Sequence, residues 1–255
     1  MTNEAVFIGI ELAGGRSITY AVLNARLQIE KKGVLPLDDL VEAILTYPLA
    51  VCAVNAPIGP SRGLLSDPNI RERLGLDPEL ATFTQHRVCE YELKRRGLNI
   101  YNTPSDPLAA PHWMQVGWQL YNRLRRAGYV EYPRAGTRRM LESYPPAAFA
   151  TFAGRRPYSK RSIEGRLQRQ IILDEAGVKV PNAMNFLEEW TRHRIMTGQL
   201  NIDRTDQLFA PNTLDALIAA YTAYLVENEP LRTIAIGDVL EGQIVLPASE
   251  LKDSY

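Results

Sequence analysis

The chain has 255 residues, of which 45% are hydrophobic and 23% charged, the composition of a globular protein that can bury a sizeable core. Its formal net charge is zero, so the whole-molecule field gives no indication of a partner. No apolar run is long enough to span a bilayer, and the first residues lack the basic segment of a secretory signal. The two cysteines lie in apolar or helical contexts, so we expect reduced thiols, a cytoplasmic location and no membrane partner.

The N-terminal part of the chain predicts three strands, a helix and a fourth strand. Apolar residues 6–12 and 17–23 flank a glycine turn, and residues 29–35 predict a third strand. Apolar residues then recur at helical spacing over 36–46, and 49–54 form a short apolar run. Because a helix connects them, the fourth strand should run parallel to the first. This β-β-β-α-β order predicts an α/β fold.

The remainder of the chain predicts mostly helices. Residues 56–82 predict a long loop with a short helix, because they are rich in Pro, Gly, Asp and Ser. Apolar periodicity, proline starts and glycine stops predict helices at 83–96, 111–127, 162–176, 183–196 and 212–227, and short strands at 129–132, 139–143, 233–236 and 243–246. We expect one domain over 1–255, with a largely helical, arginine-rich insertion at roughly 60–205.

Three polar residues lie where the predicted fold ends a strand or begins a helix. Glu11 ends the first strand, where a carboxylate can bind Mg²⁺ or Mn²⁺ through oxygen; the alternative is an acid that faces solvent. Asn55 ends the fourth strand and can offer a carbonyl oxygen, although Asn also commonly begins a turn before a proline. Asp215 lies in the first turn of the last long helix, where a capping box with Asn212 would also explain it.

A further acid and a basic region add candidates. Glu142 ends an apolar strand as Glu11 does, and is a candidate ligand or base. Between residues 122 and 169 there are twelve basic residues, eleven of them Arg, against three acids, which favours phosphate binding over solvated helix faces. The candidate phosphate or nucleic-acid ligands are Lys160, Arg166, Arg169 and Arg87. Arg87 has an alternative, an ion pair with Glu90 on the same helix face.

Several short segments together resemble the DUF429 family, whose uncharacterised members are assigned a ribonuclease H-like fold and are often described as predicted nucleases. The segments are residues 9–13, 87–93, 113–121, 142–145, 160–169, 214–216 and 237–247. The resemblance covers most of the chain. It implies a ribonuclease H-like mixed sheet flanked by helices, in agreement with the β-β-β-α-β order.

The resemblance also implies a chemistry. In ribonuclease H-like enzymes, carboxylates on the first strand, the fourth strand and a late helix hold two divalent ions that hydrolyse phosphodiesters. The corresponding positions here are Glu11, Asn55 and the start of the last long helix, at Asn212 and Asp215. The chain departs from the family pattern, which has Asp at the positions of Glu11, Asn55 and Asn212, and fewer charged ligands weaken Mg²⁺ binding.

We therefore expect a nuclease dependent on Mg²⁺ or Mn²⁺, weakened by the loss of carboxylates. Glu11, Asp215 and Glu142 are its candidate catalytic residues, and Glu11, Asn55 and Asp215 its candidate metal ligands. One alternative is a non-catalytic nucleic-acid-binding or scaffold protein with a decayed site. Another is a nucleotide-binding phosphotransferase, since sugar-kinase-like folds also begin with an acid-ended strand and a glycine hairpin, although a second glycine-rich phosphate loop is missing. The sequence leaves a homo-oligomer open.

Overall fold

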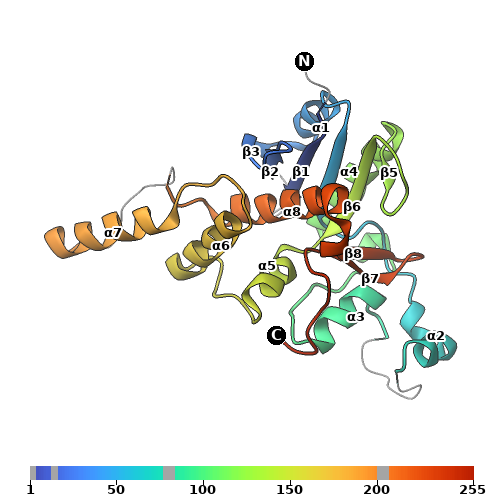
Figure 1. Cartoon of the computed structure of the whole chain (residues 1–255). Coiled ribbons are helices and arrows are strands. Elements are labelled where there is room, and N and C mark those ends of the chain that lie inside the picture. The colour runs from blue at the N-terminus through green and yellow to red at the C-terminus, as the bar shows by residue number, and fades with distance from the viewer. Residues whose placement is uncertain (1–3, 13–16, 77–83, 200–206) are drawn as a thin grey trace.

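The structure is a computed structural model that describes residues 4–12, 17–76, 84–199 and 207–255. Within these residues the centre is a mixed, eight-stranded sheet with the order β3-β2-β1-β4-β6-β8-β7 (Figure 1). The short strand β5 (Val130–Glu131) lies off this path and pairs with β6. Helices lie on both sides of the sheet, so the predicted α/β class is confirmed.

The first half of the sheet has the predicted β-β-β-α-β order. Strands β1 (Val6–Glu11), β2 (Ile18–Leu23) and β3 (Ile29–Leu35) pair antiparallel in sequence. Helix α1 (Leu37–Leu45) then leads to β4 (Ala50–Asn55), which runs parallel to β1. This arrangement is consistent with a ribonuclease H-like fold. The predicted glycine turn at 13–16 lies outside the described residues.

The second half of the sheet is built from later segments. Strand β6 (Arg138–Ser143) runs parallel to β4, and its end pairs with β8 (Gly242–Leu246). Strand β7 (Ile234–Asp238) closes the edge antiparallel to β8. Residues 60–205 were predicted to form a largely helical insertion. Strand β6 falls within this range but lies next to β4 in the sheet.

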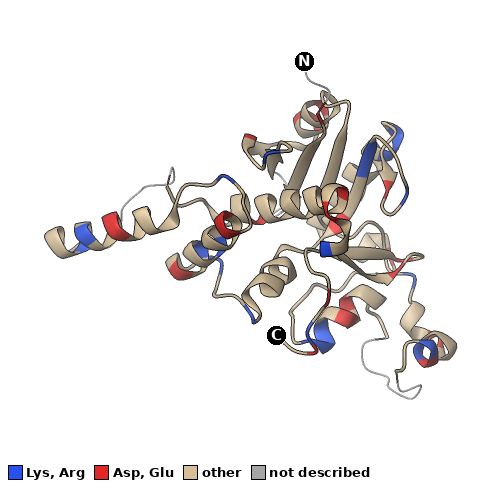
Figure 2. Ribbon diagram, viewed as in Figure 1, with Lys and Arg blue, Asp and Glu red and all other residues tan. Residues whose placement is uncertain are grey.

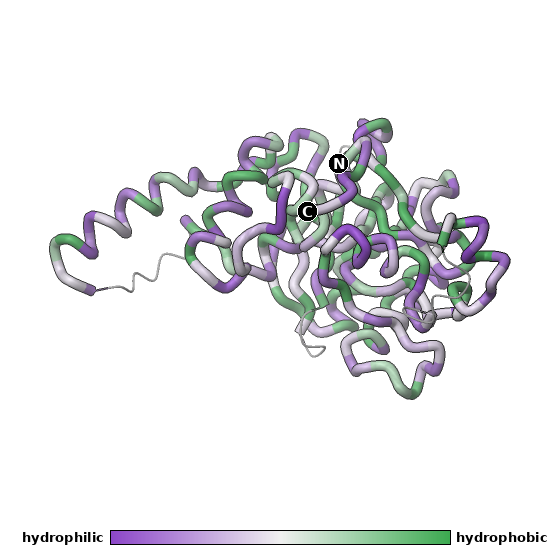
Figure 3. The backbone as a smooth tube through the Cα atoms, turned by 90° about the horizontal axis from the view of Figure 1, so that it is seen from below, coloured by the Kyte–Doolittle hydropathy of each residue, from purple (hydrophilic) through white to green (hydrophobic). Residues whose placement is uncertain are grey.

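The remaining helices surround this sheet. Those predicted at 111–127, 162–176, 183–196 and 212–227 have ends close to the predicted ones, whereas the helix predicted at 83–96 begins only at Val88 and the helix at Pro145–Ala153 was not predicted. The helices are α2 (Pro68–Arg73), α3 (Val88–Arg95), α4 (His112–Arg126), α5 (Pro145–Ala153), α6 (Ile163–Glu175), α7 (Ala183–Thr197) and α8 (Pro211–Asn228), with 3-10 turns at Leu64–Ser66, Pro107–Ala109 and Pro230–Arg232. Helix α7 extends away from the other elements in both views (Figures 1 and 3). None of the described helices has the length and apolar character needed to cross a bilayer.

Alternation along the strands creates two cores, one on each face of the sheet. On one face, Phe7, Val51 and Ala53 belong to the same buried cluster as the apolar residues of α8. On the other face, Ile8, Ile10, Cys52 and Val54 pack with residues of α1 and α4. Alternate side chains along a strand point to the same face of the sheet. Glu11 therefore lies on the same face as Phe7, and Asn55 on the same face as Ala53, which is the face that α8 covers.

Helix α8 lies directly against β1 at Gly9. A Cβ atom built on Gly9 would lie 1.8 Å from the carbonyl oxygen of Ala216 and 2.4 Å from the backbone nitrogen of Ala220. A hydrogen at this position is therefore required for the helix to sit this close to the strand. The contact brings the first turns of α8 to the face of β1 from which Glu11 projects.

Replacing Gly9 tests this contact. We expect Gly9→Ala to destabilise the protein by about 2 kcal/mol or more, because the new methyl group meets backbone atoms that cannot rotate away. Gly33→Ala in β3 is the matched control, since its Cβ would meet the Tyr20 ring no closer than 3.4 Å. Urea unfolding followed by circular dichroism measures both. Equal stability of the two variants would contradict the close packing of α8 on β1.

Candidate functional site

Glu11 and Asn55 form the first half of the site, at neighbouring strand ends. The two residues are direct partners in the parallel register of β1 and β4. The amide Nδ2 of Asn55 donates a hydrogen bond to Oε2 of Glu11 over 2.6 Å, and the Glu11 side chain is buried. The other amide atom, Oδ1 of Asn55, is also shielded from solvent and accepts no hydrogen bond from the described residues. An acceptor is thus left without a donor beside a carboxylate.

Asp215 and Lys160 form the second half. The capping box considered as an alternative for Asn212 and Asp215 is not formed, because the helix begins after Ala210 and no side chain caps it. Instead, Oδ2 of Asp215 accepts a hydrogen bond from Nζ of Lys160 over 2.6 Å. Asp215 is only 1% exposed. Burial raises the pKa of Asp215, and the positive charges of Lys160 and Arg169 oppose that rise.

Glu11 and Asn55 of the first half and Lys160 of the second half line one cavity of about 300 Å³. Its lining residues are Glu11, Leu12, Asn55, Tyr101, Trp113, Tyr144, Pro146 and Lys160. Tyr144, which follows β6, is close to both acids: burial raises the pKa of its phenol, and the negative charges of Asp215 and Glu11 raise it further. The structure therefore brings together the predicted residues Glu11, Asn55, Asp215 and Lys160 at one edge of the sheet.

The aromatic walls of the cavity were not predicted as site residues. Tyr101 stands edge-on to Trp113 with ring centres 5.1 Å apart, and edge-on to Tyr144 at 5.6 Å. Tyr144 had a sequence signal, because it directly follows a strand that ends at the same edge as β4. Tyr101 comes from an irregular segment and Trp113 from the start of α4, so their positions depend on tertiary contacts.

The side chains at the cavity fit one hard divalent cation better than two. The Glu11 carboxylate and the unpartnered Asn55 oxygen are adjacent oxygen donors of the kind that Mg²⁺ and Mn²⁺ prefer. Asp215 differs, because the ammonium of Lys160 already contacts its Oδ2. In the part of the chain that the structure describes, no group of three or more His, Cys, Asp or Glu side chains could hold a metal ion.

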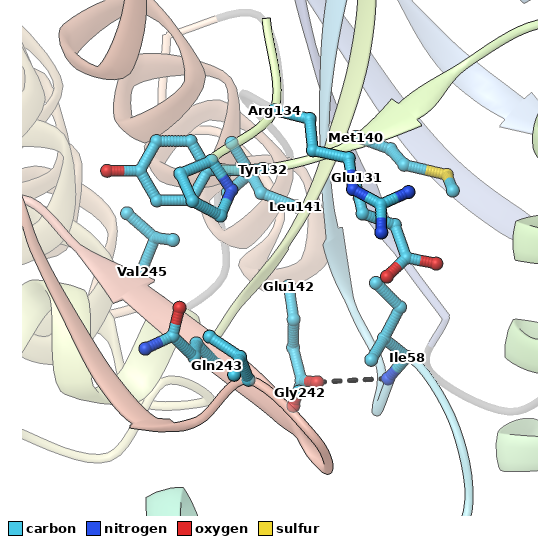
Figure 4. A pocket seen from close by; sticks show the side chains of 12 residues that line it. Ile58, Glu131, Tyr132, Arg134, Met140, Leu141, Glu142, Gly242, Gln243 and Val245 are labelled. Carbon is cyan, nitrogen blue, oxygen red and sulfur yellow. Dashed lines mark hydrogen bonds between the residues drawn. The ribbon is translucent and has the colours of Figure 1, made fainter.

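Glu142 lies outside this cavity. Glu142 lies two residues after Met140 in β6, so the two side chains point to the same face of the sheet. Met140 packs with residues of α1 and α4, and this face is opposite to the one that carries Glu11. There Nη1 and Nη2 of Arg87 donate to the two carboxylate oxygens of Glu142 over 2.9 and 2.6 Å. Its Oε2 also accepts from the backbone N–H of Ile58, and both residues line a separate pocket of about 250 Å³ (Figure 4).

Arg87 is fully enclosed, with no exposed surface. Besides Glu142, its Nε donates to Glu90 over 2.9 Å, so the ion pair considered from the sequence is confirmed. Glu90 also accepts from the backbone and hydroxyl of Thr103, and Tyr101 donates to Glu142 over 3.1 Å. Arg87 and Glu142 thus hold α3 and β6 together and present no group to a nucleic acid.

Two more of the predicted phosphate ligands, Arg166 and Arg169, are engaged with backbone carbonyls. Arg166 donates to the carbonyls of Leu208 and Phe209. Arg169 is 4% exposed, donates to the carbonyls of Tyr158 and Gly165, and lies over the Phe149 ring. Figure 2 shows the basic residues on separate elements, including β6, α3 and α7. Lys160 is the one among the four candidates that lines the cavity.

The fold and this site define an α/β protein in which Glu11 and Asn55 lie at one edge of the sheet, beside the ion pair of Asp215 and Lys160. The chain belongs to the DUF429 family, described as "Protein of unknown function (DUF429)", whose model matches residues 14–237. Asn55, Lys160 and Asp215 lie within the matched range, and Glu11 lies just before it. No curated protein and no solved structure matches the chain.

The buried arginine offers a test of the role of Glu142. We expect Arg87→Met to destabilise the protein by about 3–5 kcal/mol, because it leaves Glu90 and Glu142 buried without their cation. Arg73→Met is the control, since the Arg73–Asp238 pair is exposed and contributes at most about 1 kcal/mol. Chemical unfolding measures both variants. A loss from Arg87→Met no larger than that of the control would rule out the proposed structural role.

Proposed function

We propose that this chain hydrolyses phosphodiester bonds in nucleic acid with the help of one Mg²⁺ or Mn²⁺ ion. The observation that carries the proposal is the buried Asn55 oxygen, which has no hydrogen-bond donor among the described residues and belongs to a side chain that contacts Glu11 and lines the cavity. Glu11 and Asn55 would hold the ion. When bound, the ion supplies Lewis-acid charge to a phosphate and lowers the pKa of a water molecule.

The chain's own residues have separate tasks in this proposal. Glu11 supplies negative charge to the ion, and its hydrogen bond from Asn55 fixes the orientation of both side chains. Lys160 faces the same cavity with a positive charge that suits a phosphate oxygen. Asp215 keeps the Lys160 ammonium in place. Glu142 and Arg87 have no catalytic or binding task here, because each is buried in the other's ion pair.

The cavity walls favour an unpaired nucleotide as the group that is bound. Tyr101, Trp113 and Tyr144 supply aromatic surface beside the charged residues. Bases that are not stacked in a duplex bind aromatic side chains irrespective of sequence. A cavity of about 300 Å³ lies at the small end of the range of ligand pockets, which suits a single nucleotide unit. We therefore propose a single-stranded or unpaired segment as the substrate.

A second candidate function is binding of nucleic acid without cleavage. It is favoured by Asn55, an uncharged ligand, and by the lysine that already neutralises Asp215. The two functions differ in their response to a chelator, because binding without cleavage needs no ion. They also differ in their dependence on Glu11, because cleavage needs the ion that Glu11 holds and binding alone does not.

Removing one carboxylate oxygen of Glu11 tests the hydrolase directly. Single-stranded DNA and RNA oligonucleotides are incubated with protein and Mn²⁺, and products are resolved by electrophoresis. We expect cleavage by the wild type and a loss of about 10²-fold or more in Glu11→Gln, because the amide removes the charge that faces the ion. Glu30→Gln, an exposed acid of the edge strand β3, is the control and should keep full activity. Cleavage by Glu11→Gln at the wild-type rate would contradict the proposal.

The aromatic wall gives an independent test of substrate class. We expect Trp113→Ala to weaken binding of a fluorescent single-stranded oligonucleotide about tenfold, because stacking of one base contributes about 1–3 kcal/mol. Trp118→Ala is the matched control, since Trp118 belongs to the same helix and does not line the cavity. Fluorescence anisotropy in chelator compares the three proteins. Equal affinities would exclude Trp113 from the binding surface.

A further inference from the structure

The position of Lys160 is fixed by an unusually close set of contacts. Gly165, in the first turn of α6, lies against the preceding loop so tightly that a Cβ there would be 1.9 Å from the carbonyl oxygen of Ser159. Arg169 donates to the carbonyl of Tyr158 over 2.9 Å, and Gln168 accepts from the backbone N–H of Tyr158 over 2.9 Å. Three contacts thus hold residues 158 and 159 against helix α6. Lys160 follows them directly and lines the cavity.

The ammonium of Lys160 lies between a buried acid and the cavity. Asp215 is enclosed, with 1% of its side chain exposed, whereas the Lys160 side chain is 33% exposed. A carboxylate in such a place requires a partner cation. Arg169 also acts on Asp215 electrostatically, but its hydrogen bonds go to backbone carbonyls, and the direct contact is made by Lys160.

We propose that the Lys160 ammonium takes the place of a second divalent ion at this site. The inference rests on the proposed function, because it assigns the other cation to Glu11 and Asn55. An ammonium has three N–H donors, and one is used by Asp215. Among the described residues the other two have no acceptor, so they can donate to a phosphate oxygen in the cavity. One positive charge of the site is therefore built into the chain and is present at any metal concentration.

The inference has a consequence for metal stoichiometry. Asp215 is not a metal ligand in this protein, so the chain binds one Mn²⁺ and not two. Removing the lysine charge would free the Asp215 carboxylate for a second ion. Removing the Asp215 charge would leave the ion at Glu11 and Asn55 undisturbed.

Titration of the full chain with Mn²⁺, followed by electron paramagnetic resonance of the free ion, tests this consequence. We expect one bound ion per chain in the wild type, one of unchanged affinity in Asp215→Asn, and two in Lys160→Met. Lys179→Met, which changes an exposed lysine, should bind one ion as the wild type does. Asp215→Asn keeps the size of the side chain, so it remains informative if Lys160→Met fails to fold.

The outcomes separate this inference from the proposed function. Two ions in the wild type, or a lost or weakened ion in Asp215→Asn, would overturn the role of Lys160 and leave hydrolysis at Glu11 intact. A folded Lys160→Met variant that still binds one ion would also overturn it. Loss of the single ion in Glu11→Gln, with Asp215→Asn unaffected, would support both. Absence of any bound ion in all variants would overturn both.

Discussion

The close contact between α8 and β1 sets the geometry on which the site depends. Only a hydrogen fits between the Gly9 Cα and the backbone of α8 at Ala216 and Ala220. The helix is therefore held at backbone distance from the central strand, and its first turns reach the end of that strand. Asp215 is the residue before Ala216, so the same contact that packs the core also sets the acid of α8 on the face that carries Glu11.

The sheet separates two sets of buried charges with different tasks. On the α8 face, Glu11, Asn55 and Lys160 line a cavity, and Asp215 is buried beside it, paired with Lys160. On the other face, Glu142 is paired through both oxygens with a fully enclosed arginine. Ion pairs of the second kind hold elements together and are costly to break. Glu11 and Lys160 remain within reach of a ligand, whereas both oxygens of Glu142 are already paired with Arg87, and this difference decides which charges are functional candidates.

The sequence predicted those features that follow from strand and helix order. Glu11 and Asn55 could be placed together because two parallel strands joined by a helix end at the same edge, and the register pairs them directly. Glu142 shares the strand-end pattern of Glu11, but the face on which it emerges depends on which residues of β6 enter which core. Which face each residue of β6 occupies depends on tertiary packing and cannot be predicted from the strand pattern alone.

The partner of Asp215 could not have been derived from spacing. Lys160 is 55 residues away and lies in a loop, so its contact with Asp215 depends on how α6 packs beside α8. The arginines near it suggested phosphate binding by composition, yet Arg166 and Arg169 satisfy carbonyl groups instead. The composition gives the number of charged side chains, but the folded structure is needed to show which of them already have partners. Thus one cation of the predicted basic region lines the cavity.

The central claim is that this site holds one divalent ion at Glu11 and Asn55, with a lysine in place of a second. A crystal structure of the protein soaked in Mn²⁺, with anomalous data collected near the manganese edge, tests it most directly. We expect a single anomalous peak bordered by the Glu11 carboxylate and the Asn55 oxygen, with Lys160 still on Asp215. A peak at Asp215 with Lys160 displaced, or no peak at Glu11, would contradict it.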